Sequence, residues 1–481
     1  MSAVDVGALR RGSDWGAVHV GVAGIGVAGF AAADALLQLG ARVSVVDASE
    51  SERQQERAEV LRTLGAEVTL GDGDRLPEGI DLLVVSPGLR PSAPVIRAAL
   101  GSGVPVWGEL ELAWRLRPED DPPAWLCITG TNGKTTATLM LASMLKAAGL
   151  RAAAAGNIGD SLVSAMMHDD LEVVAVEVGA PQLPFLHTVS PHAAVCLNIA
   201  EDHVDHFGGF DEYVAAKARV YERVRVAAVY NVQDPVTERL VADADVVEGC
   251  RAVGFTLGTP AVSMLGVVED LLVDRAFLPE RRDAALELAS VADVRPAAPH
   301  NVANALAAAA LARAYGVPPL AVRDGLRSFV PAEHRIAEVA VVDGVRYVDD
   351  SKATNTHAAQ TSLLAYEPVV WIAGGLAKGQ AFDDLVVAVG GRLRAVVLLG
   401  VDRGLIRDAL ARHAPDVPVV EVDRTDTGAM DDVVRAAAVA ARPGDTVLLA
   451  PGCASWDMFR DYGQRGDLFA QAVLALSGGR P

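Results

Sequence analysis

Short apolar runs separated by helix-like stretches dominate the pattern of this chain. Near the N-terminus, apolar runs at 18–23, 43–47 and 81–85 each have the length of a buried strand. The alanine- and leucine-rich stretch between the first two runs predicts a helix to about Leu39, and Gly40 suits its C-terminal cap. Strands that alternate with helices form parallel sheets, so this part of the chain is expected to be an α/β unit.

Two further series of the same kind follow, each after a break in the pattern. The first break is the proline-rich acidic stretch 117–123, and the second is 330–333. Strands are expected at 125–128, 172–177, 193–199 and 226–231, helices at 137–148, 213–223 and 301–314, and then strands at 336–341, 345–349, 369–373, 395–400, 418–422 and 446–450. We therefore expect three α/β domains over 1–119, 120–331 and 332–481, with the first 14 residues poorly ordered.

A glycine-rich turn follows the strand 125–128 and leads into a helix. Its sequence, Thr-Gly-Thr-Asn-Gly-Lys-Thr-Thr over 129–136, places a lysine and hydroxyls where a P-loop has them. Backbone N–H groups in such a turn bind phosphate oxygens, Lys134 would reach the outer phosphates, and Thr135 would be a ligand of Mg²⁺. Ile128 stands where the common pattern has glycine, so an ordinary strand–turn–helix junction is the alternative.

The turn Gly24–Gly29 fits the dinucleotide-binding fingerprint, and Asp47 ends the next strand about 20 residues later. Taken alone, this arrangement suggests NAD. A nucleotide-sugar diphosphate would satisfy the same turn, because a helix N-terminus attracts any diphosphate. A third explanation is that the glycines only allow close packing.

Polar residues also gather where other predicted strands end. Glu177 ends one strand, and His203 lies in the charged segment 201–206 after the next one. Ligands of open α/β sheets bind outside the carboxyl ends of strands, so both are candidates for metal or phosphate chemistry, although surface residues explain them equally. Lys217, in a helix-like stretch, is expected from periodicity alone to be an exposed surface lysine.

Several later segments have both a functional and a structural explanation. Asn301 would cap a helix, or with Asn304 would contact a base or ribose. Arg335 would neutralise a phosphate or lie exposed. The segments 349–355 and 450–455 each follow a strand, so they would build one pocket at a shared sheet edge or be two ordinary turns.

Composition narrows the class of partner. The 481 residues include 42 basic and 62 acidic ones, and the net charge of −20 would repel nucleic acid. The four cysteines contain no C-x-x-C pair, which fits a reducing compartment and argues against zinc. No leader pattern is present and no apolar run reaches ~18 residues, so we expect a cytoplasmic protein that binds neither membrane nor nucleic acid.

Together these segments resemble the muramyl (Mur) ligase family, the ATP-dependent amino-acid-adding enzymes of peptidoglycan synthesis. The most specific segment is Asp-Ser-Lys-Ala-Thr-Asn at 350–355, which is similar to the glutamate-adding branch. The resemblance extends over nearly the whole chain from about residue 18 and includes the segments 130–136, 156–159, 198–203, 215–217, 300–304, 334–335, 453–455 and 464–466.

The resemblance implies a Rossmann-like N-terminal domain, a central P-loop ATPase-type domain, a Rossmann-like C-terminal domain and a role for each candidate residue. The UDP-sugar would be bound by Gly24, Gly26, Val27, Ala28, Gly29, Asp47, Ser86, Pro87, Gly88 and Asn157. ATP would be bound by Gly130, Thr131, Asn132, Gly133, Lys134, Thr135, Thr136, Asn301, Asn304, Arg335 and Asp350. Glutamate would be bound by Lys352, Thr354, Lys378, Ser455 and Tyr462.

The same resemblance implies the catalytic group. Thr135, Glu177, His203 and Lys217 would surround two Mg²⁺ ions, and Lys217 would be carbamylated into a carboxylate-like ligand. Lys134 would complete the catalytic set by binding the outer phosphates of ATP.

The implied reaction joins glutamate to UDP-N-acetylmuramoyl-L-alanine through an acyl phosphate, with ATP split to ADP and phosphate. We take D-glutamate as the expected acceptor, although no residue pattern separates the enantiomers, and we expect a monomer whose product supports cell-wall synthesis, cell shape and division. The segment Gly179-Ala180-Pro181 departs from the hydroxyl-containing family pattern, which leaves the donor contacts open. Leu376 departs where some members carry Asp, which leaves details of the acceptor site open. Alternatives are another Mur-type or folylpolyglutamate-type ligase, an NAD-dependent oxidoreductase, and a non-catalytic sugar-nucleotide-binding protein.

Overall fold

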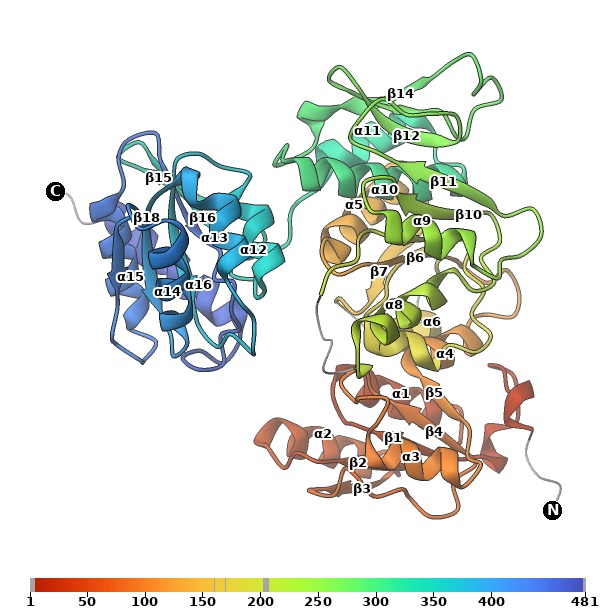
Figure 1. Ribbon diagram of the computed structural model, residues 1–481. Coiled ribbons are helices and arrows are strands. Elements are labelled where there is room, and N and C mark those ends of the chain that lie inside the picture. The colour runs from red at the N-terminus through yellow and green to blue at the C-terminus, as the bar shows by residue number, and fades with distance from the viewer. Residues whose placement is uncertain (1–4, 160, 169, 202–206, 479–481) are drawn as a thin grey trace. The chain divides into compact units, whose positions relative to one another are not determined.

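The computed structural model describes residues 5–159, 161–168, 170–201 and 207–478 (Figure 1). The chain divides into two compact units. The first comprises residues 1–297 and 301–329, and the second comprises residues 298–300 and 330–481. None of the described helices is both long and apolar enough to cross a membrane.

The first unit begins with a five-stranded parallel sheet in the order β3-β2-β1-β4-β5. Its elements are β1 (His19–Ala23), α1 (Val27–Gln38), β2 (Arg42–Asp47), α2 (Glu52–Thr63), β3 (Glu67–Leu70), β4 (Leu82–Val85), α3 (Pro94–Gly101), β5 (Val106–Gly108) and α4 (Glu109–Arg115). Every residue of β1 and β4 is buried, as expected of strands covered on both faces. Gly40 follows α1 with a left-handed φ of 89°, so its predicted role at the helix end is confirmed.

The same unit contains a nine-stranded sheet in the order β14-β13-β12-β11-β10-β9-β6-β8-β7. Its strands are β6 (Ala124–Thr129), β7 (Ala152–Gly156), β8 (Val173–Glu177), β9 (Ala193–Cys196), β10 (Ala227–Asn231), β11 (Arg251–Phe255), β12 (Met264–Val268), β13 (Leu271–Asp274) and β14 (Leu286–Ser290). Its helices are α5 (Lys134–Ala147), α6 (Leu162–His168), α8 (Phe210–Ala218), α9 (Pro235–Ala242), α10 (Pro299–Tyr315) and α11 (Pro319–Ser328), with 3-10 turns η3 (Ala180–Phe185) and η4 (Arg219–Tyr221). Only the pairings β12–β13 and β13–β14 are antiparallel.

Alternate residues of the central strands pack into different cores, because successive side chains of a strand point to opposite faces. Leu126 and Ile128 of β6 pack in a core that also contains residues of α5, α10 and α11. Trp125 and Cys127 pack in a second core that extends through α4 and α1 to β1 and β4. The two sheets of the first unit therefore share one continuous core.

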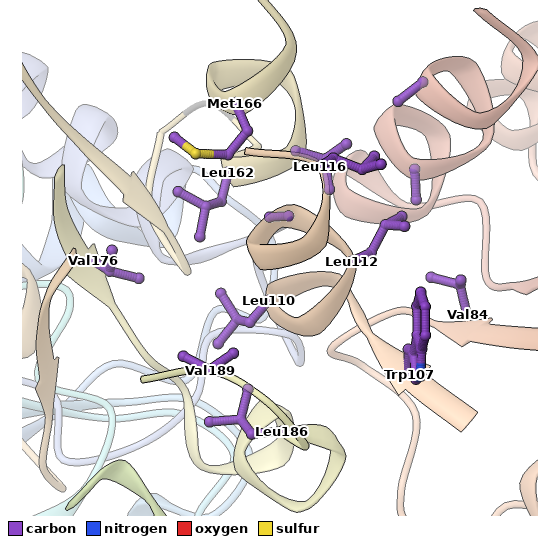
Figure 2. Close-up of a cluster of buried hydrophobic side chains, with 14 of the residues drawn as sticks. Val84, Trp107, Leu110, Leu112, Leu116, Leu162, Met166, Val176, Leu186 and Val189 are labelled. Carbon is purple, nitrogen blue, oxygen red and sulfur yellow. The ribbon is translucent and has the colours of Figure 1, made fainter. Parts of the chain in front are cut away.

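Helix α4 carries this shared core between the two sheets. Figure 2 shows Leu110, Leu112 and Leu116 of α4 among side chains of both sheets and of α6. Each of these leucines is at most 1% exposed. Burying a leucine side chain contributes about 1.5–3 kcal/mol, so α4 is a substantial part of what joins the two halves of this unit.

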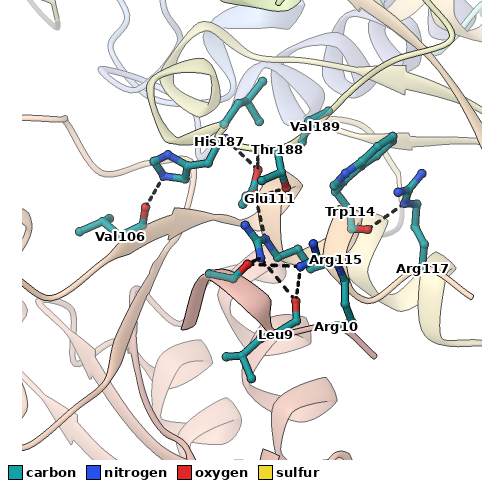
Figure 3. Close-up of polar contacts among 12 residues, drawn as sticks. Leu9, Arg10, Val106, Glu111, Trp114, Arg115, Arg117, His187, Thr188 and Val189 are labelled. Atoms are coloured by element: carbon teal, nitrogen blue, oxygen red, sulfur yellow. Dashed lines mark hydrogen bonds and ion pairs between the residues drawn. The ribbon is translucent and has the colours of Figure 1, made fainter. Parts of the chain in front are cut away.

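The N-terminal segment is ordered from Asp5 onward where the structure describes it, so the expectation of poor order is wrong for residues 5–14. Val6 and Leu9 are buried in the shared core. Arg115 of α4 donates from Nη1 to Gly7 O at 2.6 Å and to Leu9 O at 3.4 Å (Figure 3). The segment therefore stays in place because it covers apolar surface and accepts hydrogen bonds from a buried arginine.

The second unit contains a six-stranded sheet in the order β15-β16-β20-β17-β18-β19. Its elements are β15 (Ala337–Val342), β16 (Val345–Asp349), α12 (Thr356–Leu363), β17 (Val369–Gly374), α13 (Asp383–Val389), β18 (Leu393–Leu399), α14 (Arg403–His413), β19 (Val419–Glu421), α15 (Ala429–Ala440), β20 (Thr446–Leu449) and α16 (Tyr462–Gly478). All pairings are parallel except that of β15 with β16. The predicted mixed α/β class with parallel sheets is confirmed.

Three of the elements that differ from the sequence expectation belong to the nine-stranded sheet or to the helix that follows β6. Helix α5 begins at Lys134 rather than near residue 137, so the lysine and threonines belong to its first turn. Strand β9 ends at Cys196 instead of reaching residue 199. The alanine-rich stretch 152–156 forms β7, which was not predicted because alanine favours helices; pairing with β8 overrides that preference.

Candidate active site

The segment 130–136 turns the chain from β6 into α5. Gly130 (φ 150°) and Gly133 (φ 85°) have backbone conformations that favour glycine. Lys134 Nζ donates to Gly130 O and to Thr131 O, both at 2.9 Å. The lysine is therefore held over the turn whose backbone N–H groups would bind phosphate oxygens.

Thr135 links this turn to the neighbouring strand of the sheet. Its Oγ1 donates to Glu177 Oε2 at 2.7 Å, and Asn157 Nδ2 donates to Glu177 Oε1 at 3.0 Å. Glu177 ends β8 and is 2% exposed. A hydroxyl and a buried carboxylate are oxygen ligands of the kind that Mg²⁺ prefers, so the donor set fits this ion.

Lys217 lies in α8 and is 1% exposed, so the expectation of an exposed surface lysine is wrong. Its Nζ lies 4.8 Å from the centre of the Tyr213 ring, and Tyr213 Oη is 2.9 Å from Thr131 Oγ1. Burial raises the pKa of the Cys196 thiol to about 11, while the charges of Lys217 and Lys134 act in the opposite direction. Both amines therefore lie within electrostatic reach of the end of β9. His203 lies outside the described residues.

Asn304, a predicted nucleotide-binding residue, lies beside Gly133 of the turn 130–136. A Cβ built on Gly133 would meet Asn304 Oδ1 at 2.4 Å, so only glycine fits beside this amide. Asn301 donates from Nδ2 to Pro296 O at 3.2 Å, and both asparagines are buried. Asn301 lies inside α10, which begins at Pro299, so it is not the helix cap that the structural alternative predicted.

A cavity of about 570 Å³ lies in the first unit between the Gly24 turn and the segment 156–161. Of the predicted UDP-sugar residues, those that line it are Gly24, Gly26, Val27, Ala28, Asp47, Ser86, Pro87, Gly88 and Asn157. Because Asn157 also binds Glu177, the wall of this cavity is one hydrogen bond away from the Thr135–Glu177 pair. Hydrogen bonds therefore connect the wall of the cavity to the turn 130–136 through Glu177.

Two of the residues predicted to bind the UDP-sugar, Gly29 and Asp47, have structural roles. Gly29 does not line the cavity; a Cβ there would lie 1.8 Å from Gly24 O, so this glycine allows α1 to pack against the turn. Asp47 accepts from Ile25 N at 2.6 Å and from Ser49 N at 2.7 Å. Both of its carboxylate oxygens thus hold the backbone, which disfavours the ribose contact that an NAD site would need.

Glu109 and Ser161 line the same cavity and were not predicted. Ser161 Oγ donates to Glu109 Oε1 at 2.7 Å, across the seam between α4 and the segment before α6. The two side chains come from positions 52 residues apart, so no local pattern signals their meeting. Gln182, also not among the predicted residues, accepts at Oε1 from Gly179 N at 2.8 Å and keeps η3 beside Asn157.

In the second unit, the residues predicted to bind glutamate lie in three segments at one edge of the sheet. The loops follow β16, β17 and β20, which are neighbouring parallel strands. Leu376 and Ala454 exchange hydrogen bonds of 2.9 and 3.0 Å, and Gly452 N donates to Ala353 O at 2.9 Å. These bonds bring together the loops that carry Lys352, Thr354, Lys378, Ser455 and Tyr462.

Two aromatic rings hold the lysines of this edge. Lys352 Nζ lies 3.9 Å from the centre of the Tyr462 ring, and Lys378 Nζ lies 3.9 Å from that of Trp456. Trp456, which was not predicted, is 64% exposed and stands on the same loop as Ser455. A cation over an exposed aromatic ring gains about 0.5–1 kcal/mol, enough to restrict where each amine points.

Arg465 is a fully buried arginine that ties these loops together. It donates from Nε to Ser351 Oγ at 2.9 Å, from Nη2 to Ser351 O at 2.7 Å and from Nη1 to Cys453 O at 3.1 Å. Gln464-Arg465-Gly466 was noted in the sequence without a role; its arginine positions the backbone of the glutamate loops.

The predicted nucleotide residues of this unit lie beside the same edge. Burial raises the pKa of Asp350 to about 6, against the hydrogen bond from Ser362 and the charge of Arg335, which act to lower it. The neighbouring Asp349 is 2.6 Å from His334 Nδ1, and this hydrogen bond is the main cause of a raised His334 pKa. Arg335 thus shares its surroundings with a buried acid.

Family models match the chain in three consecutive stretches. A Mur ligase MurD-like N-terminal domain matches residues 18–108, a Mur ligase middle domain matches residues 128–312, and a Mur ligase glutamate ligase domain matches residues 334–453.

Named relatives match over almost the full length. The UDP-N-acetylmuramoylalanine–D-glutamate ligase of Streptomyces coelicolor is 60% identical over 467 residues, which is 96% of this chain and 99% of the relative. The protein of the same name from Thermobifida fusca is 55% identical over 463 residues, with coverage of 96% and 99%.

A solved structure, that of UDP-N-acetylmuramate-alanine ligase from Thermotoga maritima, covers 95% of this chain and 99% of its own with a TM-score of 0.57. At 19% identity, this likeness shows the fold alone. Together with the family models and the relatives, it leaves one assignment: the chain belongs to the Mur ligase family of ATP-dependent ligases.

Proposed function

We propose that this ligase joins D-glutamate to UDP-N-acetylmuramoyl-L-alanine, with ATP split to ADP and phosphate. The observation that carries the proposal is the hydrogen-bonded path Asn157–Glu177–Thr135, which runs from the wall of the 570 Å³ cavity to the phosphate turn. A sugar nucleotide in that cavity would have its distal carboxylate near the outer phosphates of ATP. The names of the relatives supply the choice of D-glutamate and of the donor.

In the proposed mechanism, phosphorylation activates the alanyl carboxylate. A carboxylate resists attack by an amine because its leaving group would be oxide. The carboxylate oxygen therefore attacks the γ-phosphorus, the bond to the β-bridging oxygen breaks, and an acyl phosphate and ADP form. Lys134 neutralises charge on the transferring group, while the backbone of the turn keeps the phosphates in line.

The second step forms the amide. The amine of glutamate attacks the acyl carbon, a tetrahedral intermediate collapses, and phosphate leaves with the bonding pair while the amine loses a proton. We propose Lys352, Thr354, Lys378, Ser455 and Tyr462 as the residues that bind the acceptor. Cations that carboxylates can approach, such as Lys352 and Lys378, suit an amino acid with two carboxylates.

Thr135, Glu177, His203 and Lys217 are the residues we propose to hold Mg²⁺, with two sites. When bound there, Mg²⁺ would supply positive charge that stabilises the transferring phosphoryl group. The burial of Lys217 supports carbamylation, because a buried cation is costly whereas a carbamate would be paired with the metal. The variant Lys217→Ala should be nearly inactive and regain part of its activity with small carboxylates; activity equal to wild type would refute the carbamate.

The reaction is tested by ADP release with UDP-N-acetylmuramoyl-L-alanine and each glutamate enantiomer. We expect release with D-glutamate and at least 100-fold less in Lys134→Ala, because one transition-state contact of this kind is worth about 2.7–4 kcal/mol. Circular dichroism of Lys134→Ala provides the folding control. Release with L-glutamate only, or none with either enantiomer, would overturn the proposal.

The setting we propose for this reaction is the cytoplasm, with a monomeric enzyme whose product enters cell-wall synthesis and so serves cell shape and division. The small-molecule substrates and the ATP requirement support this setting.

A further inference from the structure

Glu109, the first residue of α4, lies in the wall of the donor cavity and is 2% exposed. Its Oε1 accepts from Ser161 Oγ at 2.7 Å and from Leu162 N at 3.0 Å. Among the described residues, no group lies within hydrogen-bond distance of its buried Oε2. A buried polar atom left in this state is costly, so a ligand in the cavity is the natural partner.

The charge around Glu109 decides which form of the carboxyl is present. The two donors to Oε1 are a neutral hydroxyl and a backbone amide, and burial raises the pKa of this carboxyl despite both hydrogen bonds. The charged or titratable groups on the cavity wall and on the elements that pack against α4 are Asp34, Asp47, Asp74, Glu111, Arg115 and His168, with Glu177 behind Asn157. No described cation forms an ion pair with Glu109.

Because the proposed ligand is an anion, it would bind beside Glu109 only if the carboxyl of Glu109 is neutral. The proposed donor carries a diphosphate, and a carboxylate at this wall would repel it, whereas a carboxylic acid can donate a hydrogen bond. The position of Glu109 in the cavity wall also indicates which part of the ligand lies beside it. Glu109 and Asn157 line the cavity together, and Asn157 leads toward the phosphate turn.

We propose that Glu109 is a binding residue for the donor substrate: a neutral carboxylic acid whose Oε2–H donates to an oxygen of the diphosphate or of the sugar attached to it. This inference rests on the proposed function. Ser161 and Leu162 are its positioning partners, because they hold Oε1 and leave Oε2 without a hydrogen-bond partner among the described residues.

The test is calorimetric titration of the full-length protein, without ATP, by UDP-N-acetylmuramoyl-L-alanine and by UDP. Glu109→Gln keeps a neutral donor and should bind the UDP-sugar within about threefold of wild type. Glu109→Ala removes the donor and should bind about tenfold more weakly, the effect of losing one hydrogen bond. Glu56→Gln, a change at an exposed acid of α2 that does not line the cavity, is the control and should leave the affinity unchanged.

The pH profile provides a second readout, which still decides the question if Glu109→Ala does not fold. Wild-type affinity for the UDP-sugar should fall as the pH rises through the raised pKa of Glu109, because Glu109 ionises, and Glu109→Gln should show no such fall. The UDP-sugar is used because its phosphodiester does not titrate over this rise in pH.

The possible outcomes separately test the site of the contact, the role of Glu109 and the proposed function. A loss in Glu109→Ala with both ligands places the contact at the diphosphate, and a loss with the UDP-sugar only places it at the sugar. Equal affinity of wild type and Glu109→Ala, or the same pH profile in wild type and Glu109→Gln, would overturn the role of Glu109. Failure of wild type to bind the UDP-sugar at all would instead overturn the proposed function.

Discussion

Two glutamates on α4, only two residues apart, have opposite surroundings. Glu111 accepts four hydrogen bonds, from Arg115 Nε at 2.8 Å, Thr188 Oγ1 at 2.6 Å, Thr188 N at 2.9 Å and His187 N at 2.8 Å (Figure 3). Glu109 accepts two, both on one oxygen, and none comes from a charged group. Burial acts to raise both pKa values, yet it prevails only at Glu109, whereas the hydrogen bonds of Glu111 lower its pKa.

The difference shows how one helix serves structure and binding at once. The Glu111 side faces the seam between the two sheets, where every oxygen is used and the carboxylate remains charged. The Glu109 side faces the donor cavity, where one oxygen is left for a ligand. Burial of a carboxyl therefore does not by itself indicate its charge; the donors around it do.

The largest effect should come from removing the charged glutamate. Glu111→Ala leaves Arg115 buried at 4% exposure without its carboxylate, and breaking such a buried pair costs about 3–5 kcal/mol. Urea denaturation should show this loss in the free energy of unfolding. Glu56→Ala, on the exposed face of α2, should change it by no more than about 0.5 kcal/mol. A loss below about 1 kcal/mol at Glu111 would mean that the pair contributes little.

An intermediate effect should come from the hydroxyls that donate to the two acids. Thr188→Val removes a donor to a charged carboxylate and should cost about 1.5–3 kcal/mol, whereas Ser161→Ala removes a donor to a neutral one and should cost about 0.5–1.5 kcal/mol. Both values come from urea denaturation at one pH that lies above the lowered pKa of Glu111 and below the raised pKa of Glu109. Equal losses would indicate that the two carboxyls have the same charge state.

The smallest effect concerns the pH dependence of stability, and its sign differs between the two sites. The lowered pKa of Glu111 contributes stability that is present above the unfolded-state pKa of about 4.3 and is lost as the pH falls through the folded-state pKa. The raised pKa of Glu109 does the opposite: above about pH 4.3 the unfolded state ionises first, so stability declines as the pH rises toward the folded-state pKa.

Glu109→Gln should therefore remove a decline in unfolding free energy with rising pH, and Glu111→Gln should remove a gain. Urea denaturation measures the slope due to Glu111 below about pH 4.3 and the slope due to Glu109 above it. Slopes that change in the same direction in the two variants would contradict the opposite charge states.

Much of the fold followed from the sequence because strand patterns are local. The apolar runs that became β1, β2, β4, β6 and β8 could be recognised from their length and the glycines beside them. Likewise, Gly133 and Lys134 predicted the turn between β6 and α5, because only particular residues suit a tight turn before a helix. The alanine-rich strand β7 could not be predicted, because its own residues favour a helix and only pairing with β8 makes it a strand.

The candidate site was predictable only where its chemistry is contained in a short motif. The turns at 24–29 and 130–136 and the loops at 350–355 and 453–455 are of that kind. Lys217 was predicted only through the family resemblance of the segment 215–217, because in a helix the burial of a lysine depends on what packs over it, here Tyr213 and the end of β9. Arg465 likewise acquires its role only when the loops after β16 and β20 meet.

The segment Glu-Leu-Glu-Leu at 109–112 shows most clearly what the sequence alone does not predict. The sequence gives two acids that alternate with two leucines, and the structure places all four in α4. Only the tertiary structure decided that Glu111 is charged and Glu109 is available to a ligand. Apart from Arg115 on the same helix, the donors to these acids come from residues 161–162 and 187–188, which are 52 to 77 positions away in the chain. Ionisation of a buried group is set by neighbours in space, and those neighbours exist only after the chain has folded.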